Sequence, residues 1–312
     1  MAIYPTSGTS GMVGFAAAGK TTGGTGGTIV TVKTLADLQK HIGGSDRKIV
    51  VVAANISASK KTIVSLGANK TLVGSFAANT LTNLHLKATA SSSNVILQNL
   101  TIAHSAGIKG NDDIQIYLNY GNRYWVDHVT FPGHAYSSKD GALDKLLYVG
   151  AKADYVTISN CVFKNHLYGL ILGQPADDDT TAKNYKGYPH LTMVGNVFDN
   201  VNVRAPGLMR HGYFHVYNNT VNKANLAFTI AKGANIYSEA NAFSSVAGIL
   251  DDKANGNFTD VGSVPTVTGQ KSGKATWTPS SNYKYNKRAA AAAKALALKS
   301  AGARNGALTF MA

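Results

Sequence analysis

Six segments of this chain share one pattern: a β-prone run, one polar residue, and a second short β-prone run. The polar positions are Asn99, His128, Asn160, Asn196, Asn219 and Asn241. The differences between successive positions are 29, 32, 36, 23 and 22 residues. A pattern that recurs at such intervals is typical of a coiled repeat, in which each copy forms one turn of a stack.

The shortest intervals fit one coil of a parallel β-helix, with three short strands and three turns, and the longer intervals leave room for insertions. Stacked coils pair equivalent strands in parallel and keep their apolar side chains inside. Asn suits the turns because it tolerates left-handed backbone angles, and stacked Asn side chains can hydrogen-bond along the stack. An antiparallel sandwich of similar strands is the alternative, but the fixed pattern and variable insertions favour the β-helix.

The remaining segments predict one domain over residues 1–312, with a repeat core at about 28–250 and a C-terminal loop and helix at 253–312 packed on it. Residues 1–27 are rich in Gly, Thr and Ser, which indicates an extended cap or loop. Strands are predicted at 28–32, 48–53, 62–64 and 70–73, and a short helix at 34–42 with Thr34 as its N-cap. Residues 253–283 predict a long loop. The Ala/Leu/Lys-rich segment 288–301 predicts a helix that caps the open end of the stack.

The charge of the chain predicts an anionic partner. Its formal net charge is +14 over 312 residues, which suits nucleic acid, an acidic polysaccharide or a membrane surface. Ten of the 16 acidic residues nevertheless lie between residues 105 and 200. Such a concentration indicates a cation site and argues against a nucleic-acid groove, which should be basic. No apolar run approaches the length of a membrane-spanning helix, and residues 1–12 lack the pattern of a signal peptide.

Two groups of residues carry the chemistry that this charge distribution suggests. Asp112-Asp113 and Asp140-Gly-Ala-Leu-Asp144 lie at the edges of repeat strands, and Ca²⁺ prefers several carboxylate oxygens in flexible geometry. An ordinary Asp-Gly turn is the alternative for the second motif. Arg204 and Arg210 bracket a bend that contains a proline, and their forked donors suit the carboxylates of a polyanionic sugar. Pairing of both arginines with local Asp residues is the alternative.

The Asp127-His128 pair at the end of a repeat strand has two open interpretations, a general base or a structural hydrogen-bond network. Together with Asp140–Asp144, Arg204-Ala-Pro and the segment 210–219, the segment 125–128 occurs in an order that resembles the pectate lyases of polysaccharide lyase family 1. The resemblance extends from about residue 25 to residue 243. It implies an all-β, single-stranded, right-handed parallel β-helix with short terminal helices as caps. It also implies calcium-dependent β-elimination of polygalacturonate to 4,5-unsaturated oligogalacturonates.

The resemblance assigns roles to individual residues. Asp112, Asp140 and Asp144 match the calcium-binding acids of the family, and Asp113 can exchange with Asp112. Arg204 matches the base that removes the C5 proton, and Arg210 matches the arginine that binds the substrate carboxylate. Asp127-His128 matches a segment that we interpret as structural.

Two departures from the family pattern concern the substrate site. Tyr168 stands where the family usually has a substrate-binding Lys, so Tyr168, Lys164 and His166 of the same segment are the further substrate-binding candidates. The segment before Arg210 is also one residue longer than usual.

These residues predict a secreted, monomeric lyase that binds an acidic polysaccharide and Ca²⁺, and that binds neither nucleic acid nor membrane. A pectin lyase acting on methylated substrate is one alternative. Such relatives typically replace the calcium acids with basic residues, so the retained Asp140 and Asp144 argue against it. A non-catalytic uronate-binding β-helix is the other alternative, which Tyr168 keeps open.

Overall fold

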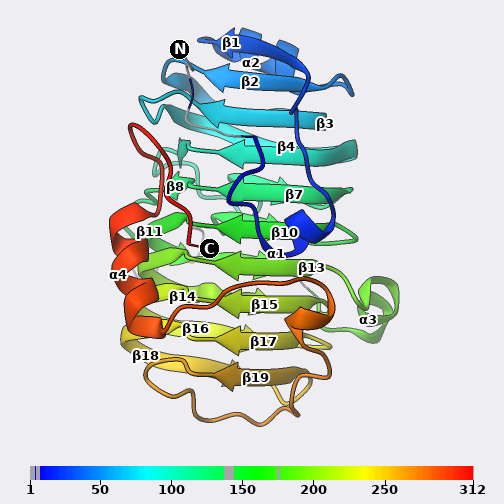
Figure 1. The fold of residues 1–312 in the computed structure, drawn as a ribbon, viewed down its shortest axis with the longest axis vertical. Helices are drawn as coiled ribbons and strands as arrows, with labels where there is room; N and C mark the ends of the chain where they lie inside the picture. Colours follow the sequence, from blue (N-terminus) through cyan, green and yellow to red (C-terminus); the bar gives the residue numbers. More distant parts are fainter. Residues whose placement is uncertain (1–3, 5–7, 137–143, 174–175, 312) are drawn as a thin grey trace.

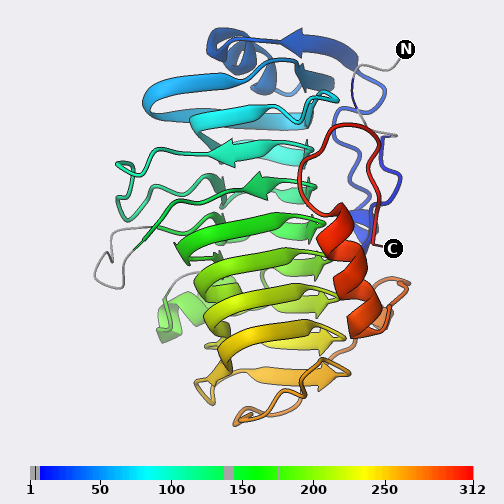
Figure 2. The same ribbon diagram turned by 90° about the vertical axis from the view of Figure 1, so that its left-hand side faces the viewer.

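The computed structural model describes residues 4, 8–136, 144–173 and 176–311. Its strands form one continuous network of 19 strands, and every pairing between them is parallel. Figures 1 and 2 show these strands stacked coil upon coil along the long axis of the molecule. The predicted parallel β-helix is therefore confirmed.

Each coil contributes strands to three faces of the stack. The first face contains the C-terminal ends of the long strands β3 (Ile56–Gly74) and β4 (Thr80–Gln98), together with β1 (Thr28–Val32), β2 (Lys48–Val52), β7 (Asn122–Asp127), β10 (Asp154–Ser159), β13 (His190–Val194), β15 (Tyr213–Tyr217), β17 (Asn235–Glu239) and β19 (Asn257–Val261). The second face contains β5 (Thr101–Ala103), β8 (Thr130–Phe131), β11 (Val162–Tyr168) and the first parts of β14 (Val197–Met209), β16 (Thr220–Ile230) and β18 (Ala242–Asp252). The third face contains β6 (Ile116–Leu118), β9 (Leu147–Val149), β12 (Leu170–Leu172) and the last parts of β14, β16 and β18.

The interior of the stack is filled by equivalent apolar side chains from successive coils. Phe131, Phe163 and Phe198 illustrate this packing, because their rings stack with centroid distances of 4.8 and 4.7 Å and all three are fully buried. Burying one such ring contributes about 1.5–3 kcal/mol. A repeat that returns an aromatic residue to the same place in each coil therefore stabilises both the coil and its register.

The six polar residues of the repeated pattern occupy two adjacent positions in the coils, not one. Val162 pairs with Val197, so Cys161 rather than Asn160 is the neighbour of Asn196. The earlier position holds Asn99, His128 and Asn160, whose φ angles are 53°, 49° and 50°. Asn accepts this left-handed conformation more readily than most residues.

The later position holds a ladder of buried amides. Oδ1 of Asn219 accepts hydrogen bonds from the backbone N of Asn196 at 3.0 Å and from its Nδ2 at 2.9 Å. Nδ2 of Asn219 in turn donates to Oδ1 of Asn241 at 3.0 Å. Left-handed turns and stacked amides were both predicted, and the structure assigns them to different residues.

The predicted helix near the N-terminus is confirmed as α2 (Leu35–Ile42). Its first turn is capped by Thr34, whose side chain accepts a hydrogen bond from the backbone N of Asp37 at 3.1 Å. Leu38 and Ile42 are fully buried in the main core, so α2 covers the end of the stack beside β1 (Figure 1). The segment before it contains a short helix that was not predicted, α1 (Gly14–Ala18), which packs on β10 and β13.

The predicted C-terminal helix is α4 (Ala290–Ser300), but its place differs from the expected one. Ala293 and Ala297 pack with Val162 and Val197 of the second face. Figures 1 and 2 show α4 lying along the flank of the stack, so the prediction that it caps the open end is wrong. Small alanine side chains allow the helix to approach the valines closely.

The remaining elements are short. They are α3 (Asp179–Tyr185), which follows β12, and the 3₁₀ turn η1 (Pro279–Ser281). The strand β19 lies inside the segment 253–283 that was predicted to be a loop. No helix in the described part of the chain is long and apolar enough to cross a membrane.

Candidate active site

Arg204 lies at a distortion in β14, where the pairing with β16 shifts register between Val203 and Gly207. Its φ angle of 63° turns the chain out of the regular strand. The backbone oxygen of Arg204 approaches Gly169 so closely that a Cβ atom there would lie 2.1 Å from it. The missing side chain at Gly169 therefore permits this bend, and the bend presents Arg204 beside Tyr168.

The guanidinium group of Arg204 stacks on an aromatic ring. Its central carbon lies 4.7 Å from the centroid of the Tyr168 ring, a distance at which a cation is attracted by the ring face. Tyr168 occupies the position where the resemblance expects a lysine, and its ring packs against the guanidinium group of Arg204.

The surroundings of Arg204 lower the pKa of its guanidinium group. Burial lowers the pKa of the guanidinium, and the positive charge of Arg210 lowers it further, while Tyr168 and Asp144 act in the opposite direction. No described carboxylate forms an ion pair with Arg204. A guanidinium with a lowered pKa loses its proton more readily than an exposed one, which is the condition for proton abstraction.

Arg210 is bound to the protein on one side. Its Nε donates to Oδ1 of Asp177, and its Nη2 lies 3.5 Å from Oδ2 of the same residue. Only 8% of the residue is exposed. This pairing matches the alternative weighed for both arginines, although for Arg210 alone. Nη1 of Arg210 is buried and has no partner among the described residues, so one donor remains for another group.

Asp112 and Asp113 face different surroundings. The carboxylate of Asp113 forms an ion pair with Lys61 at 2.5 Å. Asp112 is exposed and lines a pocket of about 170 Å³ together with Lys61, Lys87 and Tyr117. Of the two adjacent acids, Asp112 therefore has the accessible carboxylate.

Asp144 is a buried carboxylate with a lysine partner. Its Oδ1 contacts the ammonium group of Lys145 and also accepts a hydrogen bond from the Lys145 backbone N at 2.7 Å. Its Oδ2 has no partner among the described residues. Burial raises the pKa of Asp144 and the negative charge of Asp112 raises it further, while Lys145 opposes both. Asp112 thus lies close enough to Asp144 to influence its pKa. Asp140 lies outside the described residues.

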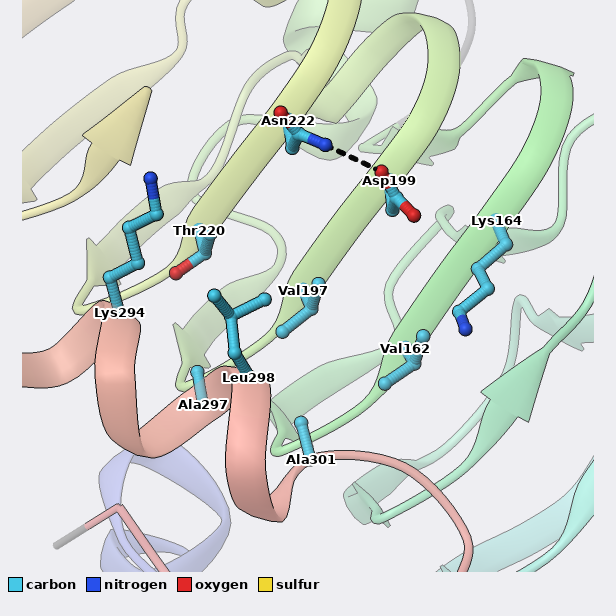
Figure 3. Close-up of a pocket in the computed structure, with 10 residues that line it drawn as sticks. All are labelled: Val162, Lys164, Val197, Asp199, Thr220, Asn222, Lys294, Ala297, Leu298 and Ala301. Carbon is cyan, nitrogen blue, oxygen red and sulfur yellow. Dashed lines mark hydrogen bonds between the residues drawn. The ribbon is translucent and has the colours of Figure 1, made fainter. Parts of the chain in front are cut away.

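Two of the substrate-binding candidates do not face the two arginines. Lys164 lines a pocket of about 410 Å³ between the second face and α4, with Asp199, Asn222 and Lys294 (Figure 3). Although larger, this pocket contains neither of the two arginines. His166 is fully buried, and its Nε2 lies 2.5 Å from the backbone oxygen of Asp144. Its buried ring therefore presents no atom to a polysaccharide chain.

Asp127 and His128 form a structural network. His128 Nδ1 lies 2.7 Å from Oδ2 of Asp127, and Oδ1 of Asp127 accepts a hydrogen bond from Ser159 at 2.7 Å. His128 Nε2 contacts the backbone oxygen of Thr309 at 3.0 Å. Both residues of the pair are fully buried, so they join two coils to the C-terminal segment rather than face a substrate.

Sequence reasoning missed the lysine partners. Lys145 is the residue after Asp144, so its position was a visible signal. Lys61 lies 52 residues before Asp113, and only the stacking of coils brings them together. Tyr168, Arg210 and Asp144 all lie close enough to Arg204 to influence the pKa of its guanidinium.

Comparison with known proteins places this chain in a family. The sequence profile described as pectate lyase matches residues 4–305. A protein of Pseudomonas marginalis named pectin lyase is 57% identical over 310 residues, covering 98% of this chain and 99% of its own length. A pectin lyase of Pectobacterium carotovorum is 56% identical over 312 residues, with coverage of 98% and 99%.

Solved structures agree on the fold. The crystal structure of a pectate lyase from Bacillus sp. N165, in complex with trigalacturonate, superposes with a TM-score of 0.77 at 22% identity, covering 93% of this chain and 98% of that one. The chain belongs to the pectate lyase family. It is accordingly a polysaccharide lyase of pectin degradation, which sets aside the non-catalytic β-helix weighed from the sequence.

Proposed function

We propose that this lyase cleaves α-1,4-linked galacturonan by β-elimination and prefers chains whose carboxylates are methyl-esterified. One observation carries the preference. Of the acids expected to bind calcium, Asp113 and Asp144 are not exposed, and each forms an ion pair with a lysine. Asp113 pairs with Lys61, and Asp144 pairs with Lys145. The name pectin lyase of the relatives at 57% and 56% identity supports the same direction. It reverses the order of preference that Asp140 and Asp144 suggested in the sequence alone.

The lysines reduce the need for a dication. A carboxylate beside the C5 proton makes that proton weakly acidic, and a pectate lyase offsets its charge with Ca²⁺. A methyl ester carries no such charge, so donors of the protein suffice for the enolate-like intermediate. Lys145 and the remaining Nη1 donor of Arg210 are the candidates for this role.

The elimination follows from the position of Arg204. Its neutral form accepts the C5 proton, the electron pair of that C–H bond forms the C4–C5 double bond, and the C4–O glycosidic bond breaks. The leaving oxygen takes a proton from water. The products are a shortened chain and a new 4,5-unsaturated end. Tyr168 acts as a positioning residue, because its ring supports the guanidinium at 4.7 Å.

Calcium-dependent cleavage of polygalacturonate is the second candidate function. It is favoured by Oδ2 of Asp144, which is buried without a partner among the described residues, and by the exposed Asp112 nearby. The described residues do not fit a calcium site as they stand, since Lys145 already neutralises Asp144. Ca²⁺ takes 6–8 oxygen ligands, and no step of the mechanism above passes through it.

One assay separates the two candidates. The ultraviolet absorbance of unsaturated uronates is followed on highly methylated pectin and on polygalacturonate, each with added calcium and with a chelator. We expect faster product formation from methylated pectin, unchanged by the chelator. Product from polygalacturonate alone, abolished by the chelator, would establish the second candidate instead.

Substitution of the base tests the mechanism. Arg204→Ala is expected to lower kcat on methylated pectin by about 10²–10⁴-fold, the usual contribution of a positioned base. Arg47→Ala removes an exposed arginine distant in sequence and serves as the matched control. Activity of Arg204→Ala close to that of the Arg47→Ala control would contradict the assignment.

The remaining expectations concern the setting of the enzyme. We propose that it is secreted, because its polymeric substrate is found outside cells, and that it is a monomer. The net charge of +14 suits the residual free carboxylates of pectin. Size-exclusion chromatography with light scattering tests the monomer.

A further inference from the structure

Four histidines gather beside the active site, and the mechanism above uses none of them. Three come from consecutive coils of the second face: His104 after β5, His134 after β8, and His166 in β11. His85 of β4 lies next to them, with its ring centroid 5.9 Å from that of His104. The parallel register of the coils produces this cluster, because equivalent positions are stacked.

Three of these rings converge on one point. The ring centroids of His104 and His134 are 4.8 Å apart, and those of His134 and His166 are 5.1 Å apart. One nitrogen from each of the three rings lies within 4.8 Å of the other two. Zinc–nitrogen bonds of about 2.0–2.1 Å in tetrahedral geometry place ligand nitrogens about 3.4 Å apart. Binding of an ion requires the rings to turn about their side-chain bonds until their nitrogens reach this separation.

The hydrogen bonds leave one nitrogen of each ring available. Nε2 of His166 faces the backbone oxygen of Asp144 at 2.5 Å, so Nε2 carries the proton and Nδ1 has the lone pair. Nδ1 of His166, Nδ1 of His104 and Nε2 of His134 are buried and have no partner among the described residues. His104 and His166 are 8% and 0% exposed, and an unpartnered buried polar atom is unfavourable for folding.

Burial favours the neutral form of the two most buried rings, His104 and His166. Burial lowers the pKa of His104 to about 3, and the neighbouring histidines lower it further. Burial likewise lowers the pKa of His166 to about 4, with the hydrogen bond to Asp144 opposing the shift. Neutral imidazole is the form that binds a metal ion.

We propose that His104, His134 and His166 bind a first-row transition metal ion, with Zn²⁺ as its representative. Three imidazoles suit Zn²⁺, Cu²⁺ and Ni²⁺, and they suit Ca²⁺ poorly because it prefers oxygen ligands. The site is therefore distinct in chemistry from any calcium site at the carboxylates. The fourth position of the ion remains for water or for His85.

Occupation of this site would stiffen the neighbouring catalytic segment. His166 holds the backbone of Asp144 through Nε2, and Tyr168 follows two residues later in the same strand. A metal ion on Nδ1 of His166 fixes the orientation of this ring and strengthens the hydrogen bond that Nε2 donates to the backbone oxygen of Asp144. The ion thereby ties three coils together next to Arg204 and its supporting ring.

Calorimetric titration of chelator-treated protein with ZnCl₂ tests the proposal without any activity measurement. We expect one equivalent of Zn²⁺ per chain and a Tm that rises by about 5 °C at saturation. Replacement of Zn²⁺ by Co²⁺ should give the visible absorption bands of a tetrahedral site with nitrogen ligands. Millimolar Ca²⁺ should leave both signals unchanged.

Two variants distinguish this site from adventitious binding at other histidines. His134→Ala alters the least buried of the three ligands and should remove the stoichiometric binding and the Co²⁺ bands. His41→Ala changes a histidine of α2, outside the cluster, and should retain both. Equal binding by His134→Ala and the unchanged protein would overturn the proposal, as would the absence of binding to the unchanged protein. Because the assay uses no substrate, its failure leaves the lyase function untouched.

Discussion

The amide ladder predicts a large and directional effect of one substitution. In Asn219→Ala the side chain that joins Asn196 to Asn241 is lost. This side chain takes part in five hydrogen bonds: two accepted from Asn196, and three donated to Asn241 Oδ1 and to the backbone oxygens of Met193 and Tyr217. All three asparagines are at most 1% exposed.

The magnitude follows from the groups left without partners. The backbone N–H of Asn196 loses its hydrogen-bond acceptor, and an unsatisfied buried donor costs about 1–3 kcal/mol. The other bonds are partly replaced, because Asn196 Nδ2 keeps the oxygen of Ile158 and Asn241 Oδ1 keeps the backbone N of Asn219. The backbone oxygens of Met193 and Tyr217 each lose a hydrogen bond worth about 1 kcal/mol, so the sum is on the order of 4 kcal/mol.

Asn222→Ala is the matched control, three residues along the same strand. Its side chain is half-buried and makes one hydrogen bond, to Oδ1 of Asp199 at 2.7 Å. Its loss should cost about 1 kcal/mol. A third variant, Asn219→Asp, keeps the acceptor but aims a buried carboxylate at the oxygens that Nδ2 now binds. It should be at least as unstable as Asn219→Ala at neutral pH.

Denaturant unfolding measures these differences, followed by far-ultraviolet circular dichroism and by tryptophan fluorescence. Trp125 is fully buried in the stack and Trp277 is half-buried in the C-terminal segment, so fluorescence reports on both regions. Coincident transitions are required for a free energy of unfolding to be defined. If Asn219→Ala loses no more stability than Asn222→Ala, or if Asn219→Asp is more stable than Asn219→Ala, the ladder does not act as described.

Three further predictions rest on single contacts. Lys145→Ala leaves the buried carboxylate of Asp144 unpaired, so Tm should fall by an amount equivalent to about 3–5 kcal/mol. Millimolar CaCl₂ should restore part of the lost Tm, and no response to calcium would show that this carboxylate does not accept the ion. Burial alone would raise the pKa of Glu239, but hydrogen bonds from three side chains lower it to about 2. The stability of about 3 kcal/mol from this network is therefore complete above the ordinary pKa of 4.5 and is lost as pH falls towards 2. Glu239→Gln should flatten that part of a curve of unfolding free energy against pH. Gly169→Ala places a Cβ 2.1 Å from the backbone oxygen of Arg204, so kcat in the absorbance assay should fall at least 10-fold. In the control Gly248→Ala the nearest neighbour of the new Cβ lies at 3.4 Å, so kcat should be nearly unchanged.

Local signals in the sequence were sufficient for many elements of the fold. Thr34 identified the start of α2 because a side-chain cap needs only the residue three positions later. The alanine-rich segment identified α4 through helix propensity alone. Its position along the flank depends on valines of β11 and β14, more than ninety residues earlier in the chain. A pattern among neighbouring residues gives no information about contacts at that separation.

The active site divides in the same way. Arg204 and Asp144 were identifiable as candidates from motif and spacing. The cation–aromatic contact with Tyr168 and the lysines on two carboxylates were not, because they depend on which coils lie next to each other. They change the substrate that we propose from free to methyl-esterified galacturonan, so the finer part of the proposal depends on these contacts.

The sequence by itself determined that this chain forms a stack of parallel coils. Apolar residues that recur once in each coil are buried together when the coils stack in parallel. Asn at the turns supplies the backbone angles and the buried amides that such a stack needs. Tertiary structure alone decided which residues of different coils meet. Insertions of unequal length separate His104, His134 and His166 by about thirty residues each in the sequence, and only the parallel register of β5, β8 and β11 brings their rings together.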